Sequence, residues 1–359
     1  MAAEVVIMNA SSPDHEALLR AGRILKKGGL VAFPTETVYG LGGDALNPRS
    51  SRKIYAAKGR PSDNPLIVHI ADIRDLPKIA AEVPEKAMEM AERFWPGPLT
   101  MIFPKTDIVP EETTGGLSSV AVRFPSDPIA RELILCSGGF IAAPSANTSG
   151  RPSPTTAAHV IDDLGGSIDM IIDGGQVGIG LESTIIDFSG ESPVILRPGY
   201  ITCEMARELI PGITIDPGLL KADSSVRPKA PGMKYRHYAP KAELTIIDGG
   251  TQQASALIRQ KAHESIASGK KTGILCSKET AGLYPEGIIR SVGSRTDEES
   301  IAKHLYEALR AFDDDGAEVI WSESFDSDGL GQAIMNRLVK AAGHRIIRTG
   351  GNENDSVGK

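Results

Sequence analysis

One short loop of the sequence brings together two cations and an amide. The segment KGRPSDNPL, residues 58–66, places Lys58, Arg60 and Asn64 in a stretch shaped by glycine and proline. A guanidinium can bind a phosphate through two parallel hydrogen bonds, and an ammonium adds a point charge. The segment therefore suits phosphate binding, although a solvated surface loop would have the same composition.

A second segment is rich in hydroxyls and follows an apolar run. In APSANTSGRPSPTT, residues 143–156, Ser145, Asn147 and Ser153 come after the predicted strand FIAA. Ligands of open α/β sheets lie beyond the carboxyl ends of strands, and free backbone N–H groups before a helix can bind phosphate. The alternative is an ordinary Ser/Pro loop with a helix N-cap at Thr155 or Thr156.

Two arginines end short apolar runs. Arg123 closes VAVR and Arg197 closes VILR, in a region, residues 1–212, that holds 19 Lys+Arg against 26 Asp+Glu. A lone arginine at a strand end is usually a surface charge. Two of them, added to Lys58 and Arg60 in a net acidic region, favour convergence on a bound anion.

Several familiar catalytic patterns do not occur in the sequence. It has no GxxxxGK[ST] loop, no GxSxG, no HExxH and no Cys/His cluster. His69, inside LIVHI, has the pattern of a buried core histidine. GLGGDA at 40–45 matches GxGxxA, but the acidic residue expected about twenty positions later is absent, and we interpret it as a tight turn. A site of cations, hydroxyls and amides suits adenylation of a carboxylate, in which the substrate itself supplies the attacking group.

The elements that position these residues alternate between helix and strand. Apolar spacing predicts helices over 15–28, 50–58 and 84–94 and one beginning near 156, with short strands between them. From residue 244 the pattern restarts, with helices predicted over 252–268, 298–313 and 331–342. The first part is typical of an α/β fold with a mixed sheet, and the last part of a small doubly wound, Rossmann-like α/β domain.

Length and charge set the domain organisation. A chain of 359 residues with net charge −7 exceeds the usual size of one hydrophobic core, so two domains are expected, at 1–212 and 244–345. Between them, residues 213–243 form a proline-containing linker that is the only net positive stretch, and 346–359 form a polar tail. Three widely spaced cysteines, no run of eighteen apolar residues and no secretion signal predict a cytoplasmic protein with no membrane contact.

Eight segments, taken in order, resemble one family, the YrdC-like threonylcarbamoyl-AMP synthases in their long, two-domain form. They are FPTETVYGLG (33–42), KGRPSDNPLIVHI (58–70), WPGPLT (95–100), VAVRFP (120–125), APSANTSGRPSPT (143–155), GLESTIID (180–187), ILRPG (195–199) and PGMKYRHYAPKAEL (231–244). The resemblance implies a YrdC-like twisted mixed sheet, a long linker and the smaller second domain. It extends to GLGQAIMNRLVKAA (329–342), which is similar to the end of that second domain.

The resemblance also implies an activity. L-Threonine, bicarbonate and ATP would give threonylcarbamoyl-AMP and pyrophosphate, for the N6-threonylcarbamoyladenosine modification of tRNA. Mg²⁺ would accompany ATP, held mostly by phosphates and water. The downstream partners would be the tRNA threonylcarbamoyl transferase machinery, with tRNA contacted only indirectly or weakly.

Site residues follow from the same resemblance. Threonine would be held by Thr37, His69, Arg123, Ala143 and Ser183, which changes the interpretation of His69 from core residue to ligand. The nucleotide would be held by Arg60, Asn64, Ser119, Ser145, Ser153, Arg197 and His237. Lys58 and Asn147 would complete the polar group at the phosphates, so that Lys58, Arg60, Ser145 and Asn147 carry the catalysis.

The linker suggests a further hypothesis. Its cluster Lys234-Tyr235-Arg236-His237-Tyr238 is basic and aromatic, which is unusual for a plain tether. We expect Tyr235 and His237 to act as a lid over bound ligand, excluding water from a hydrolysable mixed anhydride.

Two other classes of function remain as alternatives. A double-stranded RNA-binding module would use basic residues on a concave sheet, but the net negative charge opposes it. A nicotinamide oxidoreductase would rest on GLGGDA, and the missing ribose-binding acid opposes that.

Overall fold

The computed structural model describes residues 2–217 and 237–349. The chain divides into two compact units. The first comprises residues 1–149 and 153–235, and the second comprises residues 150–152 and 236–359. No helix among the described residues is long and apolar enough to cross a membrane.

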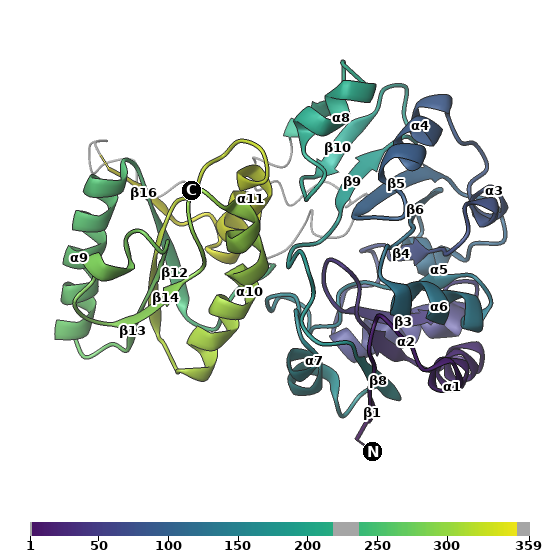
Figure 1. Ribbon diagram of the computed structural model, residues 1–359, viewed down its shortest axis with the longest axis horizontal. Helices are drawn as coiled ribbons and strands as arrows, with labels where there is room; N and C mark the ends of the chain where they lie inside the picture. Colours follow the sequence, from purple (N-terminus) through teal and green to yellow (C-terminus); the bar gives the residue numbers. More distant parts are fainter. Residues whose placement is uncertain (1, 218–236, 350–359) are drawn as a thin grey trace. The chain divides into compact units, whose positions relative to one another are not determined.

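A large mixed sheet forms the first unit (Figure 1). Within the described residues it has eleven strands in the order β1-β8-β2-β3-β7-β4-β6-β5-β9-β10-β11. The strands are β1 (Glu4–Ile7), β2 (Val31–Phe33), β3 (Gly40–Asp44), β4 (Ile67–His69), β5 (Leu99–Pro104), β6 (Ser119–Arg123), β7 (Ile141–Ala142), β8 (Met170–Asp173), β9 (Thr184–Asp187), β10 (Val194–Arg197) and β11 (Thr214–Ile215). The sheet contains both parallel and antiparallel pairs, which confirms the predicted mixed α/β fold.

Helices cover this sheet. They are α1 (His15–Lys26), α2 (Pro48–Lys58), α3 (Leu76–Ile79), α4 (Glu85–Phe94), α5 (Glu111–Thr114), α6 (Pro128–Ser137), α7 (Ala157–Leu164) and α8 (Cys203–Leu209), with a 3-10 turn at Ile73–Asp75. The predicted helices over 15–28, 50–58 and 84–94 correspond to α1, α2 and α4, and Thr156 caps α7 by accepting from the His159 amide.

Helix α6 was not predicted from the sequence. Asp127 caps its start by accepting from the Ala130 amide, and Gly138 ends it with φ of 107°. The helix packs closely on α1, because a Cβ at Gly22 would lie 2.6 Å from the carbonyl oxygen of Cys136. Glycine at position 22 therefore permits the close approach of the two helices.

The glycines of GLGGDA lie in a strand, so the predicted tight turn is wrong. Residues 40–44 form β3, which pairs antiparallel with β2. A Cβ at Gly42 would lie 2.9 Å from the Phe33 ring, and one at Gly43 would lie 3.0 Å from Cδ1 of Ile54. These glycines make room for side chains packed on both faces of the strand, which explains the pattern without a dinucleotide.

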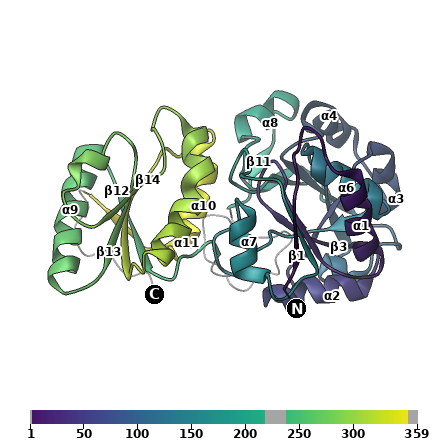
Figure 2. The ribbon, with the colours of Figure 1, turned by 60° about the horizontal axis from the view of Figure 1, so that its bottom comes forward.

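The second unit contains a parallel sheet between helices. Its strands run in the order β14-β13-β15-β12-β16, with α9 on one face and α10 and α11 on the other (Figures 1 and 2). The elements are β12 (Glu243–Asp248), α9 (Thr251–Ala267), β13 (Thr272–Cys276), β14 (Ile288–Ser291), α10 (Glu298–Asp314), β15 (Val319–Glu323), α11 (Gly331–Ala341) and β16 (Ile346–Arg348), with a 3-10 turn at Ala281–Leu283. The predicted doubly wound α/β domain is confirmed, while β14 and β16 are strands that the sequence did not predict.

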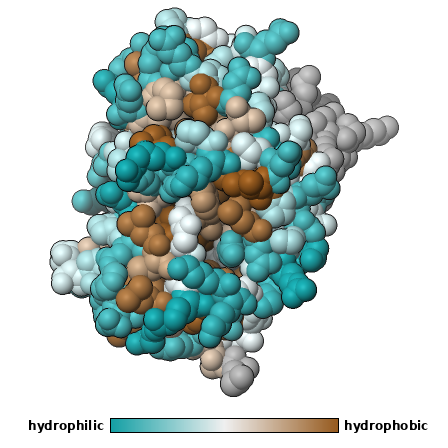
Figure 3. Space-filling model, turned by 90° about the vertical axis from the view of Figure 1, so that its right-hand side faces the viewer, coloured by the Kyte–Doolittle hydropathy of each residue, from teal (hydrophilic) through white to brown (hydrophobic). Residues whose placement is uncertain are grey.

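Apolar side chains at the surface of the first unit form separate groups among polar ones on the face drawn in Figure 3. Leu135, in α6, is one of the more exposed large apolar residues, at 59%. It borders an open groove with His15, Lys26 and Arg131, among other residues of α1 and α6.

Candidate functional site

Adjacent strands bring three of the predicted threonine-binding residues together. His69 ends β4 and Arg123 ends β6, and the two are direct partners in the parallel register. Ala143 follows β7, and its amide donates to the carbonyl of Ile67 at 2.9 Å. His69, Arg123 and Ala143 are all buried, so the strand ends form a polar group inside the protein.

Thr37 lies in the connection between β2 and β3. The Thr35 hydroxyl contacts the Thr37 hydroxyl at 2.9 Å and donates to the Val38 carbonyl at 2.7 Å, which fixes a compact turn. The Gly180 amide donates to the Thr37 carbonyl at 3.0 Å, and the Ile179 amide donates to the Glu36 carbonyl at 2.9 Å. These two hydrogen bonds therefore fix the backbone at Glu36 and Thr37.

Glu36 contacts Arg123, and sequence reasoning missed it. Nη2 of Arg123 lies 2.8 Å from Oε1 of Glu36, with side chains 5% and 14% exposed. The contact is an ion pair without hydrogen-bond geometry, because neither Glu36 oxygen nor Arg123 Nε and Nη2 has a hydrogen-bond partner. The only sequence signal was a lone carboxylate among the hydroxyls of Pro-Thr-Glu-Thr.

The surrounding groups titrate abnormally. Burial, helped by the positive charge of Arg123, lowers the pKa of His69 to about 3, so the imidazole is neutral at physiological pH. Burial also raises the pKa of Asp127 to about 6, and the negative charge of Glu36 adds to that increase. Such shifts in one small region are typical of functional sites.

Ser183 and Arg197 join the same group through Thr100. Arg197 donates from Nε to the Ser183 carbonyl at 3.0 Å and from Nη2 to the Ser183 hydroxyl at 3.1 Å. The Ser183 hydroxyl contacts the Thr100 hydroxyl at 2.7 Å. Thr100 is the register partner of Arg123, so a continuous set of polar side chains crosses β10, β9, β5 and β6.

Lys58 organises the hydroxyl-rich loop. It lies in the last turn of α2, which corrects the prediction that it belongs to the loop itself. The ammonium donates to the Ser145 carbonyl at 2.5 Å and to the Asn147 carbonyl, and the Ser145 hydroxyl donates to Oδ1 of Asn147 at 2.5 Å. Lys58 is 2% exposed, so a buried cation sets the conformation of residues 145–147.

Arg60 and Asn64 form a second small group. Arg60 donates from Nε to the Asn64 carbonyl at 3.2 Å and from Nη2 to the Pro65 carbonyl at 3.1 Å. Asn64 is 1% exposed, and its Oδ1 is buried without a hydrogen-bond partner. A buried amide oxygen in that state suits a ligand that donates a hydrogen bond.

The remaining predicted residues are more scattered. Ser153 is fully buried and donates to Glu182, while Ser119 begins β6 at the end of the strand opposite Arg123. His237 is buried in the second unit, where its ring centroid lies 5.6 Å from that of Tyr238. Tyr235, and with it most of the predicted linker and lid, lies outside the described residues.

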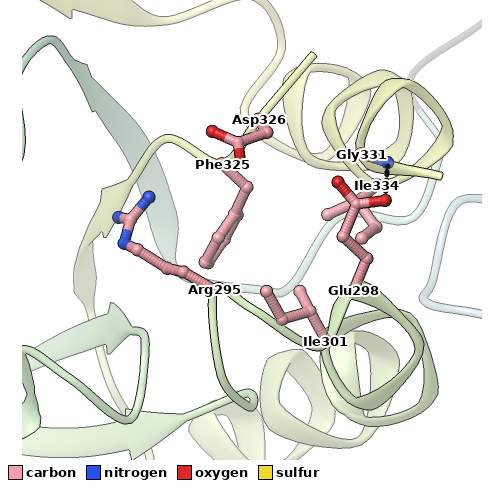
Figure 4. A pocket seen from close by; sticks show the side chains of 7 residues that line it. All are labelled: Arg295, Glu298, Ile301, Phe325, Asp326, Gly331 and Ile334. Atoms are coloured by element: carbon pink, nitrogen blue, oxygen red, sulfur yellow. Dashed lines mark hydrogen bonds between the residues drawn. The ribbon is translucent and has the colours of Figure 1, made fainter. Parts of the chain in front are cut away.

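A second arginine–carboxylate cluster, with a buried Glu323 and a partly exposed Arg295, occurs in the second unit. Oε1 of Glu323 accepts from the Tyr284 hydroxyl at 2.6 Å, and Oε2 accepts from Arg295 at 2.7 Å and from the Ser277 amide at 3.2 Å. Arg295 also lines a small pocket beside Phe325, where Glu298 accepts from the Gly331 amide (Figure 4). The cavity measures about 10 Å³, room for about one water molecule.

The polar group in the first unit can bind a small anionic molecule. It offers a buried guanidinium, a neutral imidazole, hydroxyls and a buried carboxylate. Among the described residues, no group of three or more His, Cys, Asp or Glu side chains could hold a metal ion by itself.

Two family models match consecutive parts of the chain. The model for Sua5, YciO and YrdC proteins, described as "Telomere recombination", matches residues 23–199. The model for the C-terminal domain of threonylcarbamoyl-AMP synthase matches residues 201–343.

Curated relatives and solved structures agree with these models. Threonylcarbamoyl-AMP synthase of Bacillus subtilis is 48% identical, over 96% of this chain and 98% of that protein. The Pyrococcus abyssi enzyme is 47% identical, over 96% and 99%. The crystal structure of Pyrococcus abyssi Sua5 complexed with L-threonine has a TM-score of 0.92 at 45% identity and covers 96% of this chain and 99% of that one. The chain therefore belongs to the threonylcarbamoyl-AMP synthase family, in the form that carries both domains.

Proposed function

We propose that this chain is an ATP-dependent threonylcarbamoyl-AMP synthase, which converts L-threonine, bicarbonate and ATP to threonylcarbamoyl-AMP and pyrophosphate. Near-full-length identity of 48% to a named synthase supports the activity. The observation that carries it at the site is the buried Arg123, whose Nε and Nη2 lack hydrogen-bond partners. A buried guanidinium in that state suits the bidentate carboxylate of an amino acid.

We assign amino-acid binding to the strand ends around Arg123. Arg123 would bind the carboxylate of threonine, and the neutral His69 with Thr37, Ala143 and Ser183 would form the polar wall of the pocket. The pKa of His69, lowered to about 3, keeps a second positive charge away from the threonine ammonium. The resulting pocket would favour an amino acid with a polar side chain over an apolar one of the same size.

We assign the nucleotide to the residues around Lys58 and Arg60. Lys58, Ser145 and Asn147 would lie at the phosphates, with Arg60, Asn64, Ser119, Ser153 and Arg197 holding the rest of the nucleotide. Both cations also bind backbone carbonyls, so they would place positive charge at the phosphates from a fixed framework. His237 and Tyr235 remain proposed lid residues.

The reaction then requires that the substrates be positioned next to one another, and it requires no nucleophile from the protein. The threonine carbamate attacks the α-phosphorus of ATP, an oxygen–phosphorus bond forms and pyrophosphate leaves. Mg²⁺ bound to the triphosphate would neutralise phosphate charge, and the donor set fits an ion held by phosphates and water. The product would be passed to the enzymes that transfer the threonylcarbamoyl group to tRNA.

Pyrophosphate release tests this function. The purified chain should release pyrophosphate from Mg-ATP only when threonine and bicarbonate are both present, and the nucleotide product should have the mass of threonylcarbamoyl-AMP. Replacing threonine with valine should abolish turnover, since valine leaves the polar groups of the pocket unpaired, whereas serine lacks only a methyl contact. Equal turnover with valine and serine would refute the polar pocket, and release without threonine would refute the synthase activity.

A further inference from the structure

Glu36 is a buried carboxylate to which the proposed function gives no role. It lies between Thr35 and Thr37 in the β2–β3 connection, and its backbone carbonyl accepts from the Ile179 amide at 2.9 Å. Its side chain is 14% exposed and touches Arg123 at 2.8 Å. Both carboxylate oxygens are buried without a hydrogen-bond partner. A buried carboxylate is costly, and one with unused acceptor positions points to a ligand that donates protons.

The groups around Glu36 define its electrostatic surroundings. Arg123 comes from β6, His69 from β4 and Asp127 from the start of α6. His69 is neutral, and its Nδ1 lies 3.1 Å from the Ile67 carbonyl. Asp127 accepts from the Ala130 amide at 2.9 Å and is a second carboxylate of this group.

The reaction needs an acceptor for one proton. Threonine enters with its amine protonated, and an ammonium has no lone pair with which to attack carbon. The free amine and bicarbonate combine to give the carbamate and water, with one new nitrogen–carbon bond and loss of one carbon–oxygen bond. The net change from threonine ammonium and bicarbonate is therefore carbamate, water and one proton, which a base must take.

We propose that Glu36 receives the α-ammonium of threonine and accepts its proton, which makes it the general base of carbamate formation. The inference rests on the proposed function, since it places the threonine carboxylate on Arg123. In an amino acid the ammonium and the carboxylate are attached to the same carbon. A carboxylate that touches the guanidinium is therefore within reach of the ammonium of the amino acid bound there.

The other two titratable groups are less suited to this step. The ring of His69 interacts with the carbonyls of Ile67 and Ile141, and its lowered pKa makes it a weak base. Asp127 is held as the N-cap of α6, so one of its oxygens is committed to the helix. Glu36 is the carboxylate whose two oxygens both lack such a bond.

The test compares Glu36→Gln with Glu112→Gln, a matched change at a carboxylate of the same unit that pairs with Arg52 near the surface. At pH 7 we expect kcat for pyrophosphate release to fall by about 100-fold or more in Glu36→Gln, a typical loss for a general base. The dissociation constant for threonine, measured by calorimetry, should rise by no more than about tenfold. Glu112→Gln should match the wild type in both.

The pH profile separates a base from a structural support. In Glu36→Gln the rate should rise by about tenfold for each pH unit until the threonine amine itself titrates, because solvent then supplies free amine. A loss that is constant across pH, or an unchanged kcat, overturns the proposal. So does a matching pH-dependent loss in Asp127→Asn with Glu36→Gln unaffected. If the wild type forms no threonylcarbamoyl-AMP, the proposed function itself fails, and the two failures are distinguishable.

Discussion

Each unit pairs an arginine with a largely buried glutamate near the carboxyl ends of its strands, and the two pairs differ in how their hydrogen bonds are used. In the second unit, both oxygens of Glu323 accept hydrogen bonds, and Arg295 also donates to the Ser324 carbonyl at 3.0 Å. In the first unit, Glu36 and Arg123 touch at 2.8 Å, yet both Glu36 oxygens and two Arg123 nitrogens have no hydrogen-bond partner.

The difference teaches how to tell a structural ion pair from a binding site. A buried charge pair contributes to the fold only when its remaining donors and acceptors are satisfied. Both oxygens of Glu323 meet that condition, although Nε of Arg295 is buried without a partner, and the cluster lies beside a cavity of about 10 Å³, too small for a substrate. The Glu36–Arg123 pair does not meet this condition. Unpaired donors and acceptors of this kind are expected where a bound ligand supplies the missing hydrogen bonds.

The sharpest contrast should come from removing each arginine. Arg123→Met should lower kcat/KM for threonine by about 100- to 1,000-fold, because a preorganised charge is lost from the site. Arg295→Met should stay within about twofold of the wild type while the protein remains folded. Steady-state pyrophosphate release checks both, with circular dichroism as the folding control, and a large loss of activity in folded Arg295→Met would remove the distinction.

Changes to the Glu323 cluster should affect the free energy of unfolding, in contrast to the small effect on activity expected there. Glu323→Ala removes the carboxylate that accepts from the Tyr284 hydroxyl and from Arg295, so we expect a loss of about 3–5 kcal/mol in the free energy of unfolding. Trp321, in β15, reports on this unit by fluorescence in a Trp95→Phe background. The matched change Glu264→Ala, at an exposed residue paired with Lys261, should cost far less, because solvent screens an exposed ion pair. Equal costs would mean that the buried cluster is not structural.

The smallest effect should appear in the acid stability of the first unit. With a pKa of about 3, folded His69 stays neutral where the unfolded residue takes up a proton, so this unit loses stability as pH falls below about 6.5. Asp127 acts in the opposite direction: its folded pKa of about 6 lies above the unfolded value, so it gains stability as pH falls through 6.

Asp127→Asn removes that compensation. Between pH 6 and 4 the variant should lose more stability than the wild type, by on the order of 1 kcal/mol, because Asp127 is only partly buried. Melting temperatures followed by Trp95 fluorescence in a Trp321→Phe background provide the measurement. If the melting temperatures of the wild type and of Asp127→Asn change with pH in the same way, Asp127 does not titrate in this range.

The sequence predicted the residues that end strands and missed those that depend on tertiary neighbours. Arg123 and His69 stand at the ends of clear apolar runs, so their position beside one another follows from β4 pairing with β6. Glu36 had no such signal, because its importance comes from contact with Arg123, far away in the chain. Helix α6, which the apolar pattern did not predict, has local start and stop signals in its Asp-Pro start and Ser-Gly-Gly end.

The two strands that the sequence did not predict and the glycines interpreted as a turn are errors with different physical origins. The strands β14 and β16 lie at the edges of their sheet and are partly exposed, so their apolar pattern is weak and their pairing decides their structure. The glycines of β3 resembled a phosphate-binding turn, but they are required by the side chains of Phe33 and Ile54 packed on them. No local pattern contains that information.

The strand order of the first unit has a consequence for how the protein folds during synthesis. Its first strand pairs with a strand that is made much later, Glu4 with Met170, and Leu99 pairs with Thr184. Such distant pairings slow folding, and unpaired strand edges in the waiting chain can associate with other chains. Ser183 and Arg197 are among the last residues of this sheet to leave the ribosome. The nascent chain should therefore gain threonine affinity abruptly, after β10 has emerged, and not gradually with length.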